Sequence, residues 1–339
     1  MPQAPTRSPR VSGGSIATRS ASSWNEVLGR LDREEVPARA AAHWDAHPGS
    51  LAWIGSGSNL VYRFECRGLG RYLKIIHAEL RGPDEVAATL AFQERLASGG
   101  APVCRPLRTR SGRLLAQGAH EGERWVASAV EEVEGAPVRS RSARSPAWLA
   151  IGRAIGALHR VAADPARTPE AGLRHWRDEW RHAREWLDPA DGVAQRELAR
   201  LSRWLERLPP GDSNLVPTHG DLNLGNLLWA DGRISVIDFD EPVLHWPGAD
   251  LARPMRDLLG LPRETRRRIL AALVRGYRGE RPLEERWISE LPYFLRLKEL
   301  EIYAWLESGQ RWSSSDVPGG TRSEIRAEIH ARMRAPLEW

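Results

Sequence analysis

The chain reads His219-Gly220-Asp221-Leu222-Asn223-Leu224-Gly225-Asn226 at the point that decides its fold, and shortly afterwards it reads Ile234-Ser235-Val236-Ile237-Asp238-Phe239-Asp240. Phosphoryl transfer from ATP to a hydroxyl needs an aspartate that can accept the proton of the acceptor. It also needs an asparagine and a second aspartate that hold magnesium ions against the phosphates. We therefore predict that Asp221 is the catalytic base and that Asn226 and Asp238 are the metal ligands.

Each residue of this pattern also has a structural explanation. An aspartate in a glycine-containing turn commonly stabilises the turn itself, and we expect His219 to hold the loop rather than to catalyse. Asp240 should matter less for metal binding than Asp238. It is the joint occurrence of the polar residues at this spacing that favours the catalytic interpretation.

These motifs resemble those of the aminoglycoside phosphotransferase and choline kinase-like family of small-molecule kinases, near its homoserine kinase-type and stress-response Ser/Thr kinase branch. The resemblance extends from about residue 50 to residue 310. It implies an α+β, two-lobed protein-kinase-like fold, with a small N-lobe of antiparallel sheet plus helix and a larger, mainly helical C-lobe. It also implies ATP and Mg²⁺ as cofactors, and a structural role for Asp250 in bracing the catalytic loop.

Lysine is rare in this chain. Of its 49 Lys and Arg residues, only Lys74 and Lys298 are lysines. Lys74 lies in an apolar segment, residues 71–77, that predicts a strand. A compact ammonium that touches two phosphates is not interchangeable with a planar guanidinium, so we predict that Lys74 contacts ATP. A lysine that extends from a strand edge into solvent is the structural alternative.

The segment before this strand predicts a nucleotide loop, because two short β-type segments, 51–54 and 60–66, flank a Gly/Ser turn. Backbone N–H groups in such a turn can approach phosphate oxygens, although the turn alone is more typical of an ordinary hairpin. The resemblance adds a hinge that binds adenine. The ATP-binding residues that we predict are Ser56, Gly57, Ser58, Asn59, Lys74, Glu131 and Val133.

Pro83-Asp84-Glu85 predicts the start of a helix over residues 83–98. The family resemblance implies a glutamate on this helix that pairs with the strand lysine, yet that position holds Thr89. Glu85 lies one turn earlier on the same face, so we expect it to pair with Lys74 when nucleotide is bound. If it does not, phosphates alone hold the lysine. Glu94 points elsewhere by helical geometry.

The expected organisation has three parts. Residues 1–23 are rich in Ser, Arg, Pro and Gly and are expected to form a disordered leader. Residues 24–135 form the nucleotide-binding N-lobe, in which 24–47 look helical. Residues 136–339 form the C-lobe with the catalytic loop, the metal site and the acceptor site. Trp176 and Trp180, one helical turn apart, are expected to pack rather than to stack on a ligand.

Composition excludes several classes of protein. No run of eighteen apolar residues exists, so we expect no membrane span. Two cysteines without metal-site spacing indicate a cytoplasmic protein. Despite a net charge of +5 and a pI near 9.7, acidic residues interleave with the basic ones, so we expect no nucleic-acid partner. The Walker sequence is missing, and too few residues separate Asp238 from Asp250 for a protein-kinase activation loop.

The sequence leaves the acceptor open. Residues 173–187 are basic and residues 283–307 are acidic, so a polycationic acceptor is slightly disfavoured. We predict transfer of the γ-phosphate to a hydroxyl of a small molecule, such as a metabolite, an amino alcohol or a natural product. A Ser/Thr of a peptide or protein is the second candidate. A pseudokinase scaffold is the rival from another class, but a scaffold has no need of Asp221, Asn226, Asp238 and Lys74 together.

Overall fold

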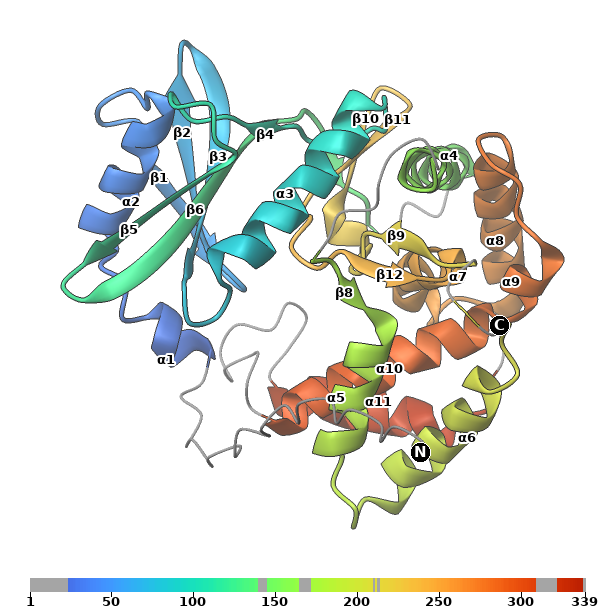
Figure 1. The fold of residues 1–339 in the computed structure, drawn as a ribbon. Helices are drawn as coiled ribbons and strands as arrows, with labels where there is room; N and C mark the ends of the chain where they lie inside the picture. Colours follow the sequence, from blue (N-terminus) through green and yellow to red (C-terminus); the bar gives the residue numbers. More distant parts are fainter. Residues whose placement is uncertain are drawn as a thin grey trace, which may run out of the picture.

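The computed structural model describes residues 24–139, 145–164, 172–209, 211, 214–308 and 322–337, so the expected leader 1–23 lies outside the described residues. Figure 1 shows a smaller lobe built on an antiparallel sheet beside a larger lobe made mainly of helices. The predicted two-lobed α+β fold is therefore confirmed.

The smaller lobe is one six-stranded sheet with helices packed against it. Its strand order is β1-β2-β3-β6-β4, and β5 pairs with the other part of β6. The central strand β6 is buried continuously from Trp125 to Val130, as expected for a strand covered on both faces. The elements of this lobe are α1 (Trp24–Leu28), α2 (Glu35–Ala41), β1 (Ala52–Ser56), β2 (Leu60–Cys66), β3 (Leu69–His77), α3 (Pro83–Ser98), β4 (Pro106–Leu107), β5 (Leu115–His120) and β6 (Glu123–Glu131).

The helical expectation for residues 24–47 is only partly correct. The segment forms two short helices, α1 and α2, followed by a single 3₁₀ turn, Ala42–Trp44. The break has a local cause: the Asp32 carboxylate accepts the backbone N–H groups of Glu34 and Glu35 at 2.8 and 2.6 Å. An aspartate that captures these N–H groups starts a new helix rather than continuing the old one.

Helix α3 joins the two lobes. It covers residues 83–98 as predicted, and its last turns contribute Phe92 and Leu96 to the hydrophobic core of the larger lobe. Phe92 packs edge-to-face on Phe239, with ring centroids 6.3 Å apart. The residue that follows Asp238 is thus in direct contact with this helix, which ties the N-lobe to the predicted metal segment.

The larger lobe surrounds two small three-stranded sheets with helices. One sheet has the order β11-β10-β7 and the other has the order β8-β12-β9. Trp176 packs on Trp246 with ring centroids 4.8 Å apart, and Trp180 lies against the same core, so packing is the observed role of both. The elements of this lobe are β7 (Ala136–Pro137), α4 (Ser145–Ala162), β8 (Arg174–His175), α5 (Trp176–Trp186), α6 (Gly192–Leu205), β9 (Val216–Thr218), β10 (Leu227–Ala230), β11 (Arg233–Val236), β12 (Val243–His245), α7 (Pro247–Ala252), α8 (Arg263–Arg278), α9 (Glu285–Ser289), α10 (Leu291–Ser308) and α11 (Arg322–Arg334).

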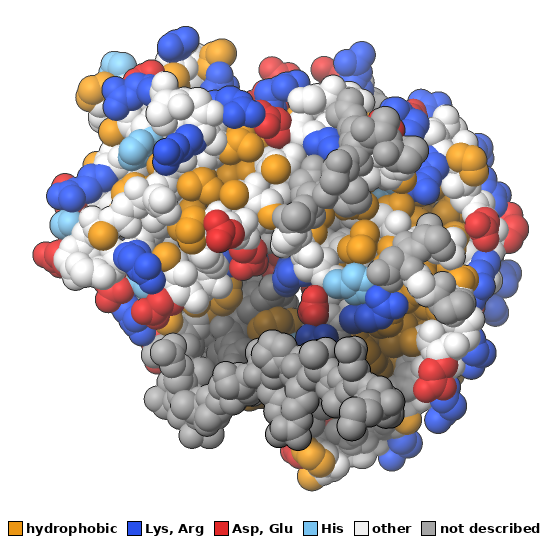
Figure 2. Space-filling view, in the orientation of Figure 1, with side chains coloured by type: hydrophobic (Ala, Val, Ile, Leu, Met, Phe, Trp, Pro, Cys, Tyr) orange, Lys and Arg blue, Asp and Glu red, His pale blue; other side chains and the backbone are white. Residues whose placement is uncertain are grey.

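The surface shows no concentration of positive charge on the face drawn in Figure 2. Lys and Arg side chains are scattered around it, with Asp and Glu among them. Within the part of the chain that the structure describes, no helix is both long and apolar enough to cross a bilayer.

Helices α4 and α8 pack unusually closely because glycines form their contact. A Cβ added at Gly152 would lie 2.0 Å from the carbonyl oxygen of Leu273, and one at Gly276 would lie 2.1 Å from that of Leu149. Backbone atoms cannot yield to such a Cβ as a flexible side chain can. The two helices must separate if either glycine gains a side chain.

We expect Gly152→Ala to lower the free energy of unfolding by about 3 kcal/mol, because the added methyl forces α4 away from α8. Urea denaturation followed by circular dichroism measures the change. Gly260→Ala is the matched control, since a Cβ there meets no atom within 4 Å. Equal stability of the two variants would contradict the close packing.

Candidate active site

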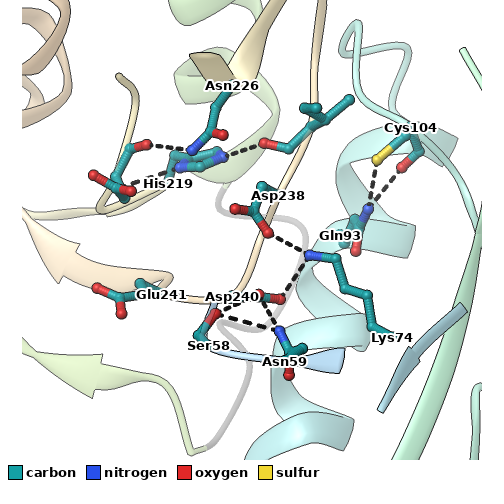
Figure 3. Close-up of polar contacts among 12 residues, drawn as sticks. Ser58, Asn59, Lys74, Gln93, Cys104, His219, Asn226, Asp238, Asp240 and Glu241 are labelled. Carbon is teal, nitrogen blue, oxygen red and sulfur yellow. Dashed lines mark hydrogen bonds and ion pairs between the residues drawn. The ribbon is translucent and has the colours of Figure 1, made fainter. Parts of the chain in front are cut away.

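His219 holds the catalytic loop at the end of β9. It is buried, its Nδ1 accepts the backbone N–H of Asp221 at 3.2 Å, and its Nε2 donates to the carbonyl oxygen of Ile237 at 2.9 Å (Figure 3). Because one ring nitrogen accepts and the other donates, the imidazole is neutral. His219 therefore ties the loop to the segment that carries Asp238, which is the structural role expected of it.

Asp250, on α7, braces the same loop from below. Its carboxylate is 1% exposed and accepts the backbone N–H groups of His219 and Gly220 at 2.8 and 3.1 Å, as well as Nε2 of His159 at 3.0 Å. Burial raises the pKa of Asp250, but His159 and the loop N–H groups outweigh burial and lower that pKa below its ordinary value. Gly220 has a φ of 82°, and a Cβ there would lie 2.0 Å from the Glu241 carbonyl oxygen, so this turn requires glycine.

The braced loop presents Asp221 in a fixed orientation. Its Oδ1 accepts from Nε and Nη2 of Arg253 at 2.9 and 2.7 Å, and its Oδ2 accepts from Nδ2 of Asn223 at 3.0 Å. The side chain is nevertheless 32% exposed. A carboxylate that is oriented by two neighbours yet open to solvent can accept a proton from a bound hydroxyl.

Asn226 and Asp238 lie next to each other beside this loop. Nδ2 of Asn226 donates to the backbone oxygen of Asp221 at 2.8 Å, so the amide oxygen is the side-chain atom that could ligate a cation. The backbone N–H of Ile237 donates to the carbonyl oxygen of Asn226 at 3.0 Å, so the segment before Asp238 is hydrogen-bonded to Asn226. Asp238 itself has a left-handed backbone with a φ of 68°, a strained conformation of the kind found at functional sites.

The oxygen atoms of this pair suit a hard cation that has further ligands. Among the described residues, no group of three or more His, Cys, Asp or Glu side chains could hold a metal ion by itself. Mg²⁺ is commonly bound by one or two protein oxygens together with water and substrate phosphates. An amide oxygen and a carboxylate therefore fit magnesium that arrives with a nucleotide.

Lys74 extends from β3 toward Asp238 and Asp240 (Figure 3). Its Nζ donates a hydrogen bond to Oδ1 of Asp238 and lies 2.9 Å from Oδ1 of Asp240. Only 16% of its side chain is exposed. Burial lowers the pKa of Lys74, but the two carboxylates outweigh burial and raise the pKa above its ordinary value. The lysine thus carries its charge inside the cleft instead of extending into solvent.

The Gly/Ser loop reaches the same cluster. β1 and β2 form the antiparallel hairpin expected on either side of it; Ser56 ends β1 and pairs with Leu60, and Gly57 begins the turn. Ser58 Oγ and Asn59 Nδ2 both donate to Oδ2 of Asp240, at 3.2 and 2.5 Å. The structure therefore brings Ser58 and Asn59 to Lys74, whereas Ser56 lies at the end of β1 and Gly57 begins the turn.

Glu131 and Val133 lie where the chain passes between the lobes. Glu131 ends β6, and β7, a few residues later, already pairs with β10 of the larger lobe. The backbone N–H of Glu131 donates to the carbonyl oxygen of Arg105 at 3.0 Å. Adenine contacts by the backbones of Glu131 and Val133 stay a prediction.

Glu85 does not lie beside Lys74 in this structure. Its carboxylate faces Arg81, one turn earlier, with 3.7 Å between Oε1 and Nε, while Lys74 pairs with two aspartates instead. The physical reason is that Arg81, a buried cation four residues before Glu85, is the nearer partner. Glu94 points away from the site, as expected, and accepts from Nη2 of Arg108 through both oxygens at 2.7 Å.

A model of the phosphotransferase enzyme family matches residues 54–287. The chain belongs to this family. The predicted family and the predicted class of enzyme, a phosphotransferase, are thereby confirmed. The residues matched include most of the smaller lobe's sheet, part of the larger lobe and the whole loop 219–226.

Individual relatives of this phosphotransferase are distant. An amicoumacin kinase from Bacillus subtilis (strain 168) is 25% identical over 80% of this chain and 84% of its own length. A homoserine kinase from Methylobacterium sp. (strain 4-46) is 28% identical over 67% of this chain and 70% of its own.

Solved structures share the fold. An amicoumacin kinase in complex with AMP-PNP, Ca²⁺ and its ligand superposes with a TM-score of 0.79 at 21% identity, covering 92% of this chain and 97% of that one. A microcompartment-associated aminopropanol kinase gives a TM-score of 0.70 at 21% identity, covering 88% and 94%.

The phosphotransferase carries a row of buried and half-buried charges that runs from the N-lobe to α10. We name this row the charge ladder; its members, in order, are Arg81, Glu241, Arg174, Glu179, Lys298 and Glu301. Successive members alternate in sign, and the distances between their charged atoms are 3.5, 3.9, 3.5, 3.8 and 3.7 Å.

The ladder ends beneath the catalytic loop. Glu179, Lys298 and Glu301 line a cavity of about 20 Å³ together with Gly220 and Arg253. Burial and the neighbouring Glu179 raise the pKa of Glu301 well above its ordinary value. Lys298 thus lines a cavity with Gly220 of the loop 219–226, and Lys74 contacts Asp238 and Asp240 of the segment that follows this loop.

Several of these residues escaped the sequence analysis. Arg253 and Arg81 look like any of the many arginines of this chain, and no local pattern marks them. Lys298 is different, because the scarcity of lysine that singled out Lys74 applies to it equally. That signal could have located the far side of the site.

We expect Lys298→Met to lower the free energy of unfolding by about 3 kcal/mol, because it leaves Glu179 and Glu301 buried without their shared cation. Urea denaturation measures the loss. Adding Glu301→Gln to Lys298→Met should recover part of it, since one of the stranded carboxylates is then removed. Wild-type stability in Lys298→Met would show that the ladder does not depend on this charge.

Proposed function

We propose that this chain transfers the γ-phosphate of ATP to a hydroxyl group of a small molecule, with Mg²⁺ as the metal. The observation that carries the proposal is the position of Asp221. It sits on a loop braced by Asp250, its carboxylate is oriented by Arg253, and the next residues along the site are the two oxygen donors, Asn226 and Asp238. A scaffold without activity would not need this arrangement.

The nucleotide is proposed to lie between the lobes. Lys74, Ser58 and Asn59 meet there and offer a cation and two polar side chains for the phosphates. The backbones of Glu131 and Val133 are proposed to bind adenine. The amicoumacin kinase of the same fold was solved with AMP-PNP, and a spectinomycin phosphotransferase was solved with ADP, which supports the binding of a nucleotide by this chain.

Asn226 and Asp238 are proposed to hold the magnesium. Ca²⁺ accompanies AMP-PNP in the amicoumacin kinase, which supports a divalent cation, and oxygen donors suit Mg²⁺. When bound, the metal neutralises charge on the transferring phosphate. Lys74 contributes a further positive charge, and Asp221 takes the proton that the hydroxyl loses.

The proposed acceptor is a small alcohol rather than a polycation. The relatives and fold neighbours include kinases named for homoserine, glucosamine and aminopropanol, which are small compounds that carry a hydroxyl and an amino group. The acids of the charge ladder are already paired with Arg174 and Lys298, so they do not form the open acidic trough that a polycation requires. Screening amino alcohols, hydroxylated natural products and Ser/Thr peptides with labelled ATP identifies the acceptor class.

Two further expectations become part of the proposal. The proposed boundary between the N-lobe and the C-lobe lies after residue 135, since the chain leaves the sheet of the smaller lobe just before it and enters the larger lobe at β7. We also keep a cytoplasmic location, where ATP is supplied; Cys66 and Cys104 are free thiols, as a reducing compartment would leave them.

Asp221→Ala should lower turnover about 100-fold or more, because no other group replaces the carboxylate that accepts the proton. Asp221→Asn should be equally impaired, since an amide keeps the shape but cannot take the proton. Initial rates with the identified acceptor measure turnover, and calorimetry should show nearly unchanged ATP affinity in both variants. Turnover above about a tenth of the wild-type value in either variant would remove Asp221 from this role.

Asp238→Asn should abolish the magnesium-dependent part of nucleotide affinity, because it replaces the charged metal ligand. The measurement is ADP affinity by calorimetry with magnesium and with a chelator, for the wild type and the variant. The wild type should bind more tightly with magnesium, whereas the variant should bind equally under both conditions. A wild type that is indifferent to the chelator would refute the metal assignment.

A further inference from the structure

Lys74 needs a counter-charge that the helix does not supply. Its side chain is mostly buried, and a buried ammonium without a carboxylate or phosphate nearby is costly. Helix α3 offers Thr89 on the face toward the lysine, since Thr89 and Lys74 line the same cavity of about 30 Å³. Glu85, one turn earlier, is paired with Arg81.

Asp240 fills this gap from the other lobe. Its Oδ1 lies 2.9 Å from Nζ of Lys74, and its Oδ2 accepts from Asn59 and Ser58. The carboxylate is 15% exposed, so these bonds form in a largely dry environment in which they are strong. One side chain therefore holds both the lysine and the Gly/Ser loop.

Asp238 cannot serve as the counter-charge of Lys74 throughout the proposed reaction. It also contacts Lys74, but its carboxylate is the proposed metal ligand and is 41% exposed. A carboxylate that ligates a metal gives up much of its interaction with a neighbouring ammonium. Asp240 is more buried than Asp238 and is also held by Asn59 and Ser58, so it can keep the lysine in place in either state.

We infer that Asp240 is the positioning residue for Lys74, in place of the helix glutamate, and that it also anchors the loop 56–59 over the nucleotide site. The inference rests on the proposed function, because that proposal identifies this place as the nucleotide site. The contacts of Asp240 themselves are observed in this structure. Asp240 was expected to matter less than Asp238; the geometry assigns it a different role, not a smaller one.

The size of the cavity provides a direct test. Thr89 borders a cavity of about 30 Å³ beside Lys74, which has room for at least one water molecule. A glutamate at position 89 can use this space to bring a carboxylate to the lysine. The counter-charge can thus be moved from one lobe to the other by two substitutions.

The experiment compares Asp240→Asn, Thr89→Glu and the double variant in the full chain. Asp240→Asn should raise the KM for ATP and weaken ADP binding about tenfold, because the lysine loses its charged partner while the loop keeps an amide oxygen as acceptor. Thr89→Glu alone should bind like the wild type. The double variant should recover most of the ADP affinity, so the two changes should be far from additive.

Hydrogen exchange tests the loop separately. Without nucleotide, Asp240→Ala should speed amide exchange in residues 55–59, since Ser58 and Asn59 lose their acceptor, whereas Asp240→Asn should change it little. Glu94→Gln is the matched control, because it removes a carboxylate from α3 that points away from Lys74 and pairs with Arg108. It should leave both measurements unchanged.

Two outcomes would overturn the inference. One is wild-type ADP affinity and wild-type loop exchange in Asp240→Ala and Asp240→Asn. The other is a tenfold loss in Glu85→Gln that Asp240→Asn does not share, which would return the role to the helix. Because ADP binding and exchange need no acceptor, they decide this point even if no hydroxyl compound is phosphorylated, a result that would count against the proposed function instead.

Discussion

The site depends on one buried carboxylate. Asp250 accepts two successive backbone N–H groups of the catalytic loop and a third hydrogen bond from His159. In a dry interior these bonds are strong when all are made and costly when one is missing. They fix the turn at Gly220, and from this turn follow the direction of Asp221 and the position of Asn226. The brace therefore determines where Asp221, the proposed proton acceptor, and Asn226, a proposed metal ligand, lie relative to each other.

Helix α3 transmits position between the lobes. Its last turns belong to the core of the larger lobe, and Phe92 touches Phe239, the residue between Asp238 and Asp240. Lys74 and the Gly/Ser loop belong to the smaller lobe, and their side chains contact the same short segment, residues 238–240. The smaller lobe is thus held to residues 238–240, the predicted metal segment, by the aromatic contact of Phe92 and by the ion pairs of Lys74. These contacts supplement the single segment of chain that connects the two lobes covalently.

The sequence predicted those parts of the fold and the site that local patterns encode. The hairpin around the Gly/Ser turn, helix 83–98 and the loop 219–226 were foreseen because each has its own turn or capping signal. The break within 24–47 was missed because Asp32 acts as a cap in the middle of an apolar pattern. The partners of Lys74 were missed for a different reason: Asp240 lies 166 residues away, and the helix position that usually supplies the charge gives no hint of where a replacement would come from. Arg253 and Arg81 are hidden by the abundance of arginine.

That abundance bears on the two lysines. Where a charge only needs a carboxylate partner, this chain uses arginine, as in the pairs of Arg63 with Glu132 and Arg108 with Glu94. Lys74 and Lys298 each face two carboxylates with a single compact ammonium. Arg81 and Arg174 also face two carboxylates, but each reaches them with two different guanidinium nitrogens. Lysine therefore remains at the two positions where compactness decides, and both lie at the catalytic loop or the segment that follows it. The choice between lysine and arginine at a site can thus indicate how much space the site offers, even though both residues carry the same charge.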